Sequence, residues 1–116
     1  MLDALGRFFR HESDPLLIGL LVDEHKVNAR GFLHAGVLAI IADVTIGHAL
    51  ARSTDPPTNL LTVNLSCDYT GVAEVETWVD GTIGIARVGR RLAVGTITFT
   101  AAGRAIGSAR GLFLPA

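Results

Sequence analysis

The chain reads HAGVLAIIADVTIGHALA from His34 to Ala51. This stretch is dominated by Ala, Leu, Ile and Val, contains no proline and has no break before Gly47, which is typical of an α-helix. At about 100° per residue, its apolar positions cover nearly the whole helical wheel. A helix that is apolar all round is buried all round. We therefore expect a sheet to wrap around a long helix over residues 34–51.

Four segments after this helix have the pattern of β-strands. From Leu61 to Thr70, apolar and polar residues alternate with a period of two, which is typical of a half-buried strand. Further strands are expected over residues 74–86, 91–101 and 105–114. Turn residues separate these segments, so the connections are short and the sheet is predicted to be an antiparallel meander.

The residues before the helix complete the predicted fold. An apolar run covers residues 16–22 and is expected to form a first strand. Residues 1–14 are expected to form a short amphipathic helix, because Leu2, Leu5, Phe8 and Phe9 recur at helical spacing. The order of elements predicts one α+β domain over residues 1–116, with a curved antiparallel sheet wrapped around one long central helix.

Composition points to a homo-oligomer. Of 116 residues, 49% are hydrophobic and only 18% are charged, which is apolar for so small a domain. Apolar surface that a single copy leaves exposed is expected to be covered by a second copy. The net charge of −1 provides no basic excess for a phosphate backbone, so nucleic acid is not an expected partner.

Other features limit the compartment and the cofactors. The single cysteine, Cys67, excludes an internal disulfide and a multi-cysteine metal site, and the four histidines have no metal-binding arrangement. The N-terminus lacks the basic-then-apolar order of a signal peptide. The longest apolar run, Ala35 to Ala42, is shorter than the roughly 20 residues of a membrane span. We expect a cytoplasmic protein with no metal and no membrane association.

Asp43 is the anomaly of the predicted helix. A carboxylate among isoleucines and valines is costly unless it is paired, hydrogen-bonded or used in chemistry. Three small residues lie within about 40° of it on the helical wheel and leave room for another molecule: Gly36, Ala39 and Gly47. Two interpretations stay open, a structural aspartate bonded to backbone or serine and a functional carboxylate.

The start of the helix offers a complementary group. The first backbone N–H groups of a helix have no intrahelical partner and lie at the positive end of its dipole, which suits a polarised carbonyl. His34 and Ala35 occupy this position, although a histidine here is also typical of a helix cap. Nine residues separate His34 from Asp43, about 180° around the helix. Two antiparallel helices from two chains would bring the two groups onto one substrate.

The motif around the helix start resembles a known family. The segment Asn28–Gly36, NARGFLHAG, followed by Ala42 and Asp43, resembles the signature of the hotdog-fold thioesterases, nearest the branch of 4-hydroxybenzoyl-CoA and phenylacetyl-CoA thioesterases. That signature is asparagine, glycine, His-Gly-Gly and an acidic residue nine positions after the histidine. The resemblance implies a hotdog fold, hydrolysis of acyl-coenzyme A without a cofactor, and a dimer of hotdogs that assembles into a tetramer.

The resemblance also implies roles for individual residues. Asp43 would be the nucleophile or general base, and the backbone N–H of Ala35 would polarise the thioester carbonyl. Asn28 and His34 would position the substrate, the water or the loop, and Thr62 would orient the water. The implied substrate-binding residues are Gly36, Arg87, Gly89, Arg90 and Arg91, and of these Arg90 and Arg91 would contact the nucleotide end of coenzyme A. Ala35 departs from the family's first glycine, and its methyl group is expected to narrow the acyl groups accepted.

The sequence also bears on three other functions. The chain has no Gly-x-Ser-x-Gly elbow, which a serine hydrolase would need. A hotdog-fold enoyl-CoA hydratase or dehydratase would use Asp43 and His48, five residues apart, but the Asn-Pro pair of that motif is missing. A non-catalytic acyl-CoA binding or sensing module stays open as well. The acyl group itself is not indicated by the sequence.

Overall fold

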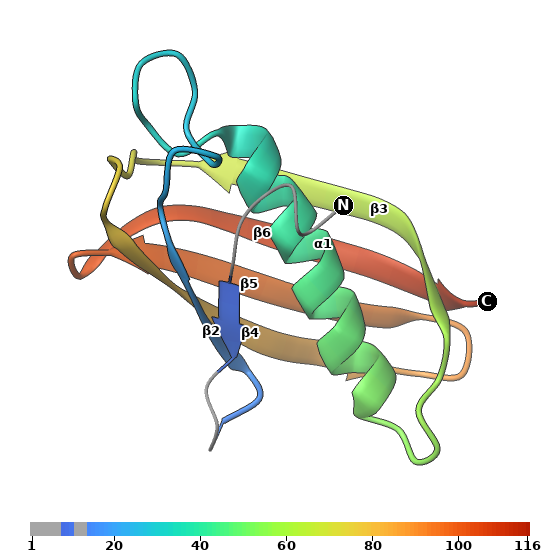
Figure 1. The fold of residues 1–116 in the computed structure, drawn as a ribbon. Coiled ribbons are helices and arrows are strands. Elements are labelled where there is room, and N and C mark those ends of the chain that lie inside the picture. The colour runs from blue at the N-terminus through green and yellow to red at the C-terminus, as the bar shows by residue number, and fades with distance from the viewer. Residues whose placement is uncertain (1–7, 11–13) are drawn as a thin grey trace.

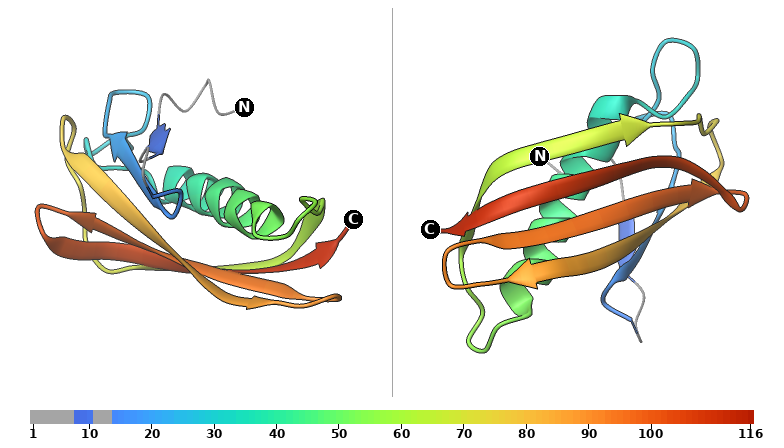
Figure 2. Two further views of the ribbon diagram at one scale, coloured as in Figure 1. Left: turned by 90° about the horizontal axis from the view of Figure 1, so that it is seen from below. Right: turned by 180° about the vertical axis from the view of Figure 1, so that it is seen from behind.

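The computed structural model describes residues 8–10 and 14–116. Its elements are, in chain order, β1 (Phe8–Arg10), β2 (Leu17–Leu21), α1 (Ala35–Arg52), β3 (Leu60–Tyr69), β4 (Trp78–Val88), β5 (Ala93–Ala101) and β6 (Arg104–Pro115). The strands form one antiparallel sheet, and α1 lies across one of its faces (Figures 1 and 2). This is the α+β arrangement that the sequence predicts.

The position of β3 differs from the predicted meander. Strands β4, β5 and β6 do form a meander, but the sheet order is β1-β2-β4-β5-β6-β3. β3 therefore pairs with β6, from Leu60 opposite Pro115 to Tyr69 opposite Gly107. Residues 70–77 are too long a connection for a tight hairpin and lead the chain from β3 to the opposite part of the sheet. The prediction that β3 neighbours β4 is wrong, and β3 is an edge strand.

The predicted N-terminal helix is wrong where it can be compared. Phe8–Arg10 form β1, which pairs antiparallel with β2, Phe8 lying opposite Leu20. Residues 1–7 and 11–13 of that prediction lie outside the described residues. A few apolar residues at close spacing fit a strand as well as a helix, so periodicity alone could not decide this segment.

The helix is buried on one face and not all round. Its side chains that pack against the sheet are Val37, Leu38, Ile41, Ala42, Thr45, Ile46 and Leu50. Asp43 and Gly47 are half-buried and His48 is exposed, so the prediction of complete burial is wrong for the single chain. With 18 residues and a mean hydropathy of 1.4, α1 would be long and apolar enough to cross a membrane, but its contacts with β3, β4, β5 and β6 are those of a core helix.

A glycine lets the helix approach the sheet closely. A Cβ atom at Gly95 in β5 would lie 2.6 Å from Cγ2 of Ile46, closer than any real contact. Gly95 is buried, and Ile46 is fully buried. The absence of a side chain at this position therefore sets the height of α1 above the sheet.

Candidate functional site between the helix and the edge strand

Asp43 is held by a residue of the edge strand. The Thr62 hydroxyl on β3 donates a hydrogen bond of 2.6 Å to Oδ1 of Asp43 on α1. The aspartate is half-buried, and within the described part of the chain its second carboxylate oxygen has no hydrogen-bond partner. Thr62 thus fixes the carboxylate and leaves one oxygen available to a substrate or a water.

The helix start presents one unused backbone donor. His34 is the N-cap, and its Nδ1 accepts a hydrogen bond of 2.9 Å from the N–H of Gly36. The N–H of Val37 donates to the carbonyl of His34 at 3.0 Å. The N–H of Ala35, which precedes both of these donors, donates to no acceptor among the described residues. His34 and Ala35 are exposed, so this donor is accessible from outside.

Asn28 and Lys26 shape the loop that leads into the helix. Oδ1 of Asn28 accepts from the N–H groups of Arg30 and Phe32, at 2.9 and 3.3 Å, so its contacts are within the loop. The Lys26 side chain is 1% exposed, and its ammonium pairs with Asp23 at 2.8 Å, which lowers the pKa of Asp23. The carbonyl of Lys26 accepts the N–H of His34 at 2.7 Å, which ties the loop to the helix start.

The sequence patterns did not reveal one residue that contacts the helix start. The hydroxyl of Tyr69, the last residue of β3, donates to the carbonyl of Ala35 at 2.6 Å. The two residues are 34 positions apart. The strand pattern placed Tyr69 among the apolar residues of its segment, and no local signal connects it with the helix.

One chain does not bring Asp43 and the Ala35 donor to the same carbonyl. The two residues are eight positions apart on α1, which corresponds to about 12 Å along the helix axis. A reacting oxygen lies about 3–3.5 Å from the carbonyl carbon, and an oxyanion donor about 3 Å from the carbonyl oxygen. Together, these two distances are shorter than the roughly 12 Å that separates Ala35 and Asp43 along the helix axis.

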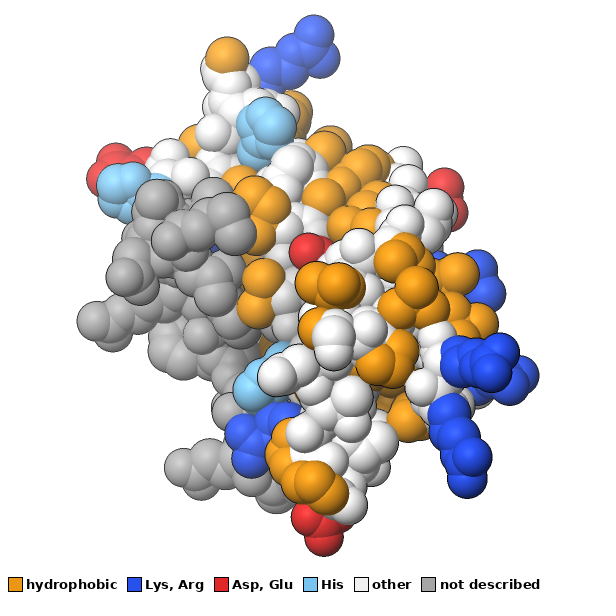
Figure 3. Space-filling model, turned by 90° about the vertical axis from the view of Figure 1, so that its right-hand side faces the viewer, with side chains coloured by type: hydrophobic (Ala, Val, Ile, Leu, Met, Phe, Trp, Pro, Cys, Tyr) orange, Lys and Arg blue, Asp and Glu red, His pale blue; other side chains and the backbone are white. Residues whose placement is uncertain are grey.

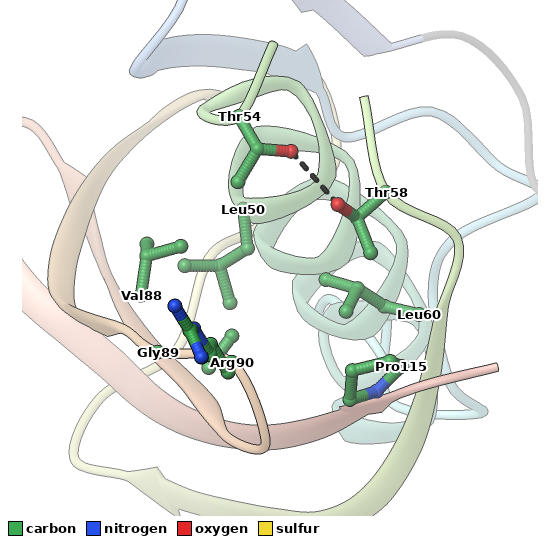
Figure 4. Close-up of a pocket in the computed structure, with 9 residues that line it drawn as sticks. Leu50, Thr54, Thr58, Leu60, Val88, Gly89, Arg90 and Pro115 are labelled. Atoms are coloured by element: carbon green, nitrogen blue, oxygen red, sulfur yellow. Dashed lines mark hydrogen bonds between the residues drawn. The ribbon is translucent and has the colours of Figure 1, made fainter. Parts of the chain in front are cut away.

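A cavity of about 310 Å³ lies beyond Asp43, at the C-terminal end of the helix. Leu50, on its wall, is two helical turns beyond Asp43 on the same side of α1. Leu60, also on the wall, shares a face of β3 with Thr62. Figure 4 shows Leu50 and Leu60 beside this space, with Thr54 and Thr58 joined by a 2.9 Å hydrogen bond.

The arginines predicted to bind the substrate lie close together at one hairpin. Residues 87–91 cover the end of β4 and most of the turn that leads to β5, and all of them are exposed. Gly89 and Arg90 line the cavity, whereas Arg87 and Arg91 lie beside it in the chain. Within residues 14–116, no carboxylate forms an ion pair with Arg90. Gly36, the remaining predicted binding residue, uses its N–H for the bond to His34.

The side of the molecule on which α1 ends and β3 begins is largely apolar. Figure 3 shows hydrophobic side chains gathered around an acidic one, with Lys and Arg side chains at the margin. The exposed hydrophobic residues of β3 include Leu61, with 59% of its surface accessible, and Val63, with 51%. Among the described residues, no group of three or more His, Cys, Asp or Glu side chains could hold a metal ion.

The comparisons with known proteins define the class of this protein. The chain matches the thioesterase superfamily over residues 30–108, more than half of its length, and it belongs to that superfamily. A relative from Pseudomonas aeruginosa, named "Putative esterase PA0474", is 36% identical over 115 residues, which cover 97% of this chain and 86% of that protein.

Two solved structures share the fold. Zebrafish thioesterase superfamily member 2 superimposes with a TM-score of 0.81 at 22% identity, covering 86% of this chain and 73% of that chain. A hypothetical thioesterase from Streptococcus pneumoniae TIGR4, solved with coenzyme A, gives a TM-score of 0.78 at 18% identity, covering 85% and 78%. The predicted hotdog fold is therefore confirmed.

Proposed function

We propose that this protein hydrolyses acyl-coenzyme A thioesters, with Asp43 as the nucleophile or general base. The observation that carries the proposal is the 2.6 Å bond from Thr62, which holds Asp43 on the open side of α1 with one oxygen unused. Membership of the thioesterase superfamily supports it. The bound coenzyme A in the Streptococcus pneumoniae structure supports coenzyme A as the carrier.

The Asp43 carboxylate and the Ala35 N–H are a sufficient set of groups to hydrolyse a thioester. A thiolate is a good leaving group, since a free thiol has a pKa of about 8.5. In one route, the Asp43 carboxylate attacks the carbonyl carbon and expels the thiolate, and water then hydrolyses the resulting anhydride. In the other, Asp43 takes a proton from a water that attacks directly. In both, the Ala35 N–H stabilises the negative charge that develops on the carbonyl oxygen.

The complete site requires two chains. The donor and the carboxylate are too far apart in one copy, and β3 is a long edge strand whose only charged residue is Asp68. Such edges normally pair with another chain or are blocked by charge or proline. We therefore assign the Asp43 of one chain and the Ala35 of its partner to each site, in a homo-oligomer whose smallest unit is a dimer.

A lysine on this edge should dissociate the oligomer. Val63→Lys places a charge on the exposed edge of β3, where pairing would bury it. Sedimentation velocity should show the wild type as a dimer or larger and the variant shifted to monomer. Thr98→Lys, at an exposed position of the interior strand β5, is the control. A wild type that sediments as a monomer and is fully active would refute the two-chain site.

We assign the phosphate-bearing end of coenzyme A to the cavity and its hairpin. The long pantetheine arm separates the phosphates from the thioester, and the cavity lies about two helical turns from Asp43. Its walls at Leu50, Leu60 and Val88 are apolar, and Arg90 is the cation among its lining residues. Arg87 and Arg91 add charge to the same hairpin.

Arg90→Gln should raise KM without changing kcat. An exposed charge pair contributes at most about 1 kcal/mol, which corresponds to about a fivefold increase in KM. The effect should shrink with added salt and vanish with an acyl-pantetheine substrate that lacks the nucleotide. Arg104→Gln, at the first residue of β6, is the matched control. An equal rise of KM for both substrates would exclude a contact with the nucleotide end.

A thiol-release assay over a panel of acyl-coenzyme A esters tests the function directly. Turnover of at least one aromatic or aliphatic ester is expected, and the best ester identifies the acyl group. Binding without thiol release would support the non-catalytic module. Water addition to an enoyl-coenzyme A would support the hydratase, although Asp43 and His48 are about 140° apart around α1 and do not share a face.

A further inference from the structure

The peptide unit between Ala35 and Gly36 is held on both sides. Its N–H donates to Nδ1 of His34 at 2.9 Å, and its carbonyl accepts from the hydroxyl of Tyr69 at 2.6 Å. The first bond comes from the adjacent residue, whereas the second comes from the far end of β3. A peptide plane with both polar groups bonded has little freedom to rotate.

This peptide controls the donor assigned to the thioester carbonyl. The N–H of Ala35 belongs to the preceding peptide unit. The two peptide planes meet at the Cα atom of Ala35, and the φ and ψ angles of this residue set their relative orientation. Helix ends fray readily, and both His34 and Ala35 are exposed. A donor stabilises developing charge well only when it is already oriented before the reaction. An anchor outside the helix is therefore needed for the first turn.

We infer that Tyr69 is a positioning residue that orients the Ala35 N–H through its bond to the Ala35 carbonyl. This inference rests on the proposed hydrolysis and on the role of the Ala35 donor. The strand β3 then serves both halves of the chemistry, because Thr62 holds the carboxylate and Tyr69 holds the donor. The phenol adds nothing to the chemical step itself and touches no reacting atom.

The ionisation of Tyr69 agrees with a donor role. Burial raises the pKa of Tyr69 to about 12, and the nearby Cys67 raises it as well, although 44% of the residue's surface is accessible. The phenol therefore keeps its proton, and can donate, at any pH at which a thioester is assayed.

Tyr69→Phe tests the inference, because it deletes only the hydroxyl. We expect kcat to fall by about threefold to tenfold, the effect of one lost hydrogen bond, with KM changed less than twofold. Thr70→Val is the matched control, since the neighbouring Thr70 hydroxyl also reaches a backbone carbonyl, that of Ala105, away from the helix start. Its kcat should equal that of the wild type.

A double-mutant cycle separates positioning from general stability. In an Ala35→Pro background, which lacks the donor N–H, Tyr69→Phe should have no further effect on kcat. A multiplicative loss in the double variant, or an unchanged kcat in Tyr69→Phe alone, would overturn the inference. Either result could be seen only in a wild type that hydrolyses thioesters, so failure of the proposed function would be recognised first.

Discussion

Asp43→Asn is expected to lower kcat for acyl-coenzyme A hydrolysis by about 10²–10⁴-fold, the range that a positioned acid or base contributes. The amide has the shape of the carboxylate and its oxygen can still accept from Thr62, so the fold should be kept. It can neither attack the carbonyl nor accept a proton from water. Thiol release gives kcat, and calorimetric titration with a non-hydrolysable acyl-coenzyme A analogue should give a nearly unchanged Kd.

The control for this variant is Asp68→Asn. Asp68 is an exposed carboxylate on β3, and its neutralisation should leave kcat unchanged. If Asp43→Asn retained more than a tenth of the wild-type kcat, another group would have to supply the nucleophile or base. In that case Asp43 would be a structural residue bonded to Thr62.

Ala35→Pro is expected to lower kcat by about 10²–10³-fold, the cost of one oxyanion donor. Ala35 is the first residue of α1, the position at which helices accept proline best. His34 has φ −71° and ψ 131°, which is the backbone conformation favoured before proline. The substitution thus removes the N–H group with little strain, and the free energy of unfolding should be unchanged or slightly higher.

Ala35→Gly is the control for the donor. It keeps the N–H and removes only the methyl group, so kcat should stay within a few-fold of the wild type. It should also widen the range of acyl groups hydrolysed, if the alanine narrows the site. A proline variant with wild-type kcat and normal stability would show that the carbonyl is polarised by a different group.

Mixing the two inactive variants tests whether each site spans two chains. When Asp43→Asn and Ala35→Pro chains are refolded together in equal amounts, half of the dimers contain one of each. Each such dimer has one site with both defects and one site with neither, so about a quarter of the wild-type activity should return. A mixture no more active than the two variants apart would place the whole site within one chain.

The local patterns predicted most of the elements. The composition of residues 34–51 predicted α1 nearly to the residue, and the alternation from Leu61 to Thr70 predicted β3. Asp43 attracted attention because a charge is costly in an apolar helix. These features depend on residues that are neighbours in the sequence. The periodicity of apolar residues and the residue types are therefore enough to predict them.

The remaining features depend on contacts between distant residues. Nothing within Leu60–Tyr69 indicates that β3 pairs with β6 and not with β4, because alternation predicts a strand but not its partner. The same limit hid the bond from Tyr69 to Ala35. An apolar helical wheel shows that α1 must be covered, but it does not distinguish a sheet on every side from a sheet on one side and a second chain on the other.

The missing side chain at Gly95 has a consequence for the position of Asp43. Ile46, which rests above Gly95, is one turn of α1 beyond Asp43. A Cβ atom at Gly95 would displace α1 away from the sheet and would increase the distance between the Asp43 carboxylate and Thr62. The distance between Thr62 and Asp43, on which the proposed chemistry depends, is thus set on the sheet-facing side of the helix by the lack of a side chain at Gly95. If the proposed hydrolysis is correct, selection for it should constrain Gly95 as tightly as the residues assigned to the site.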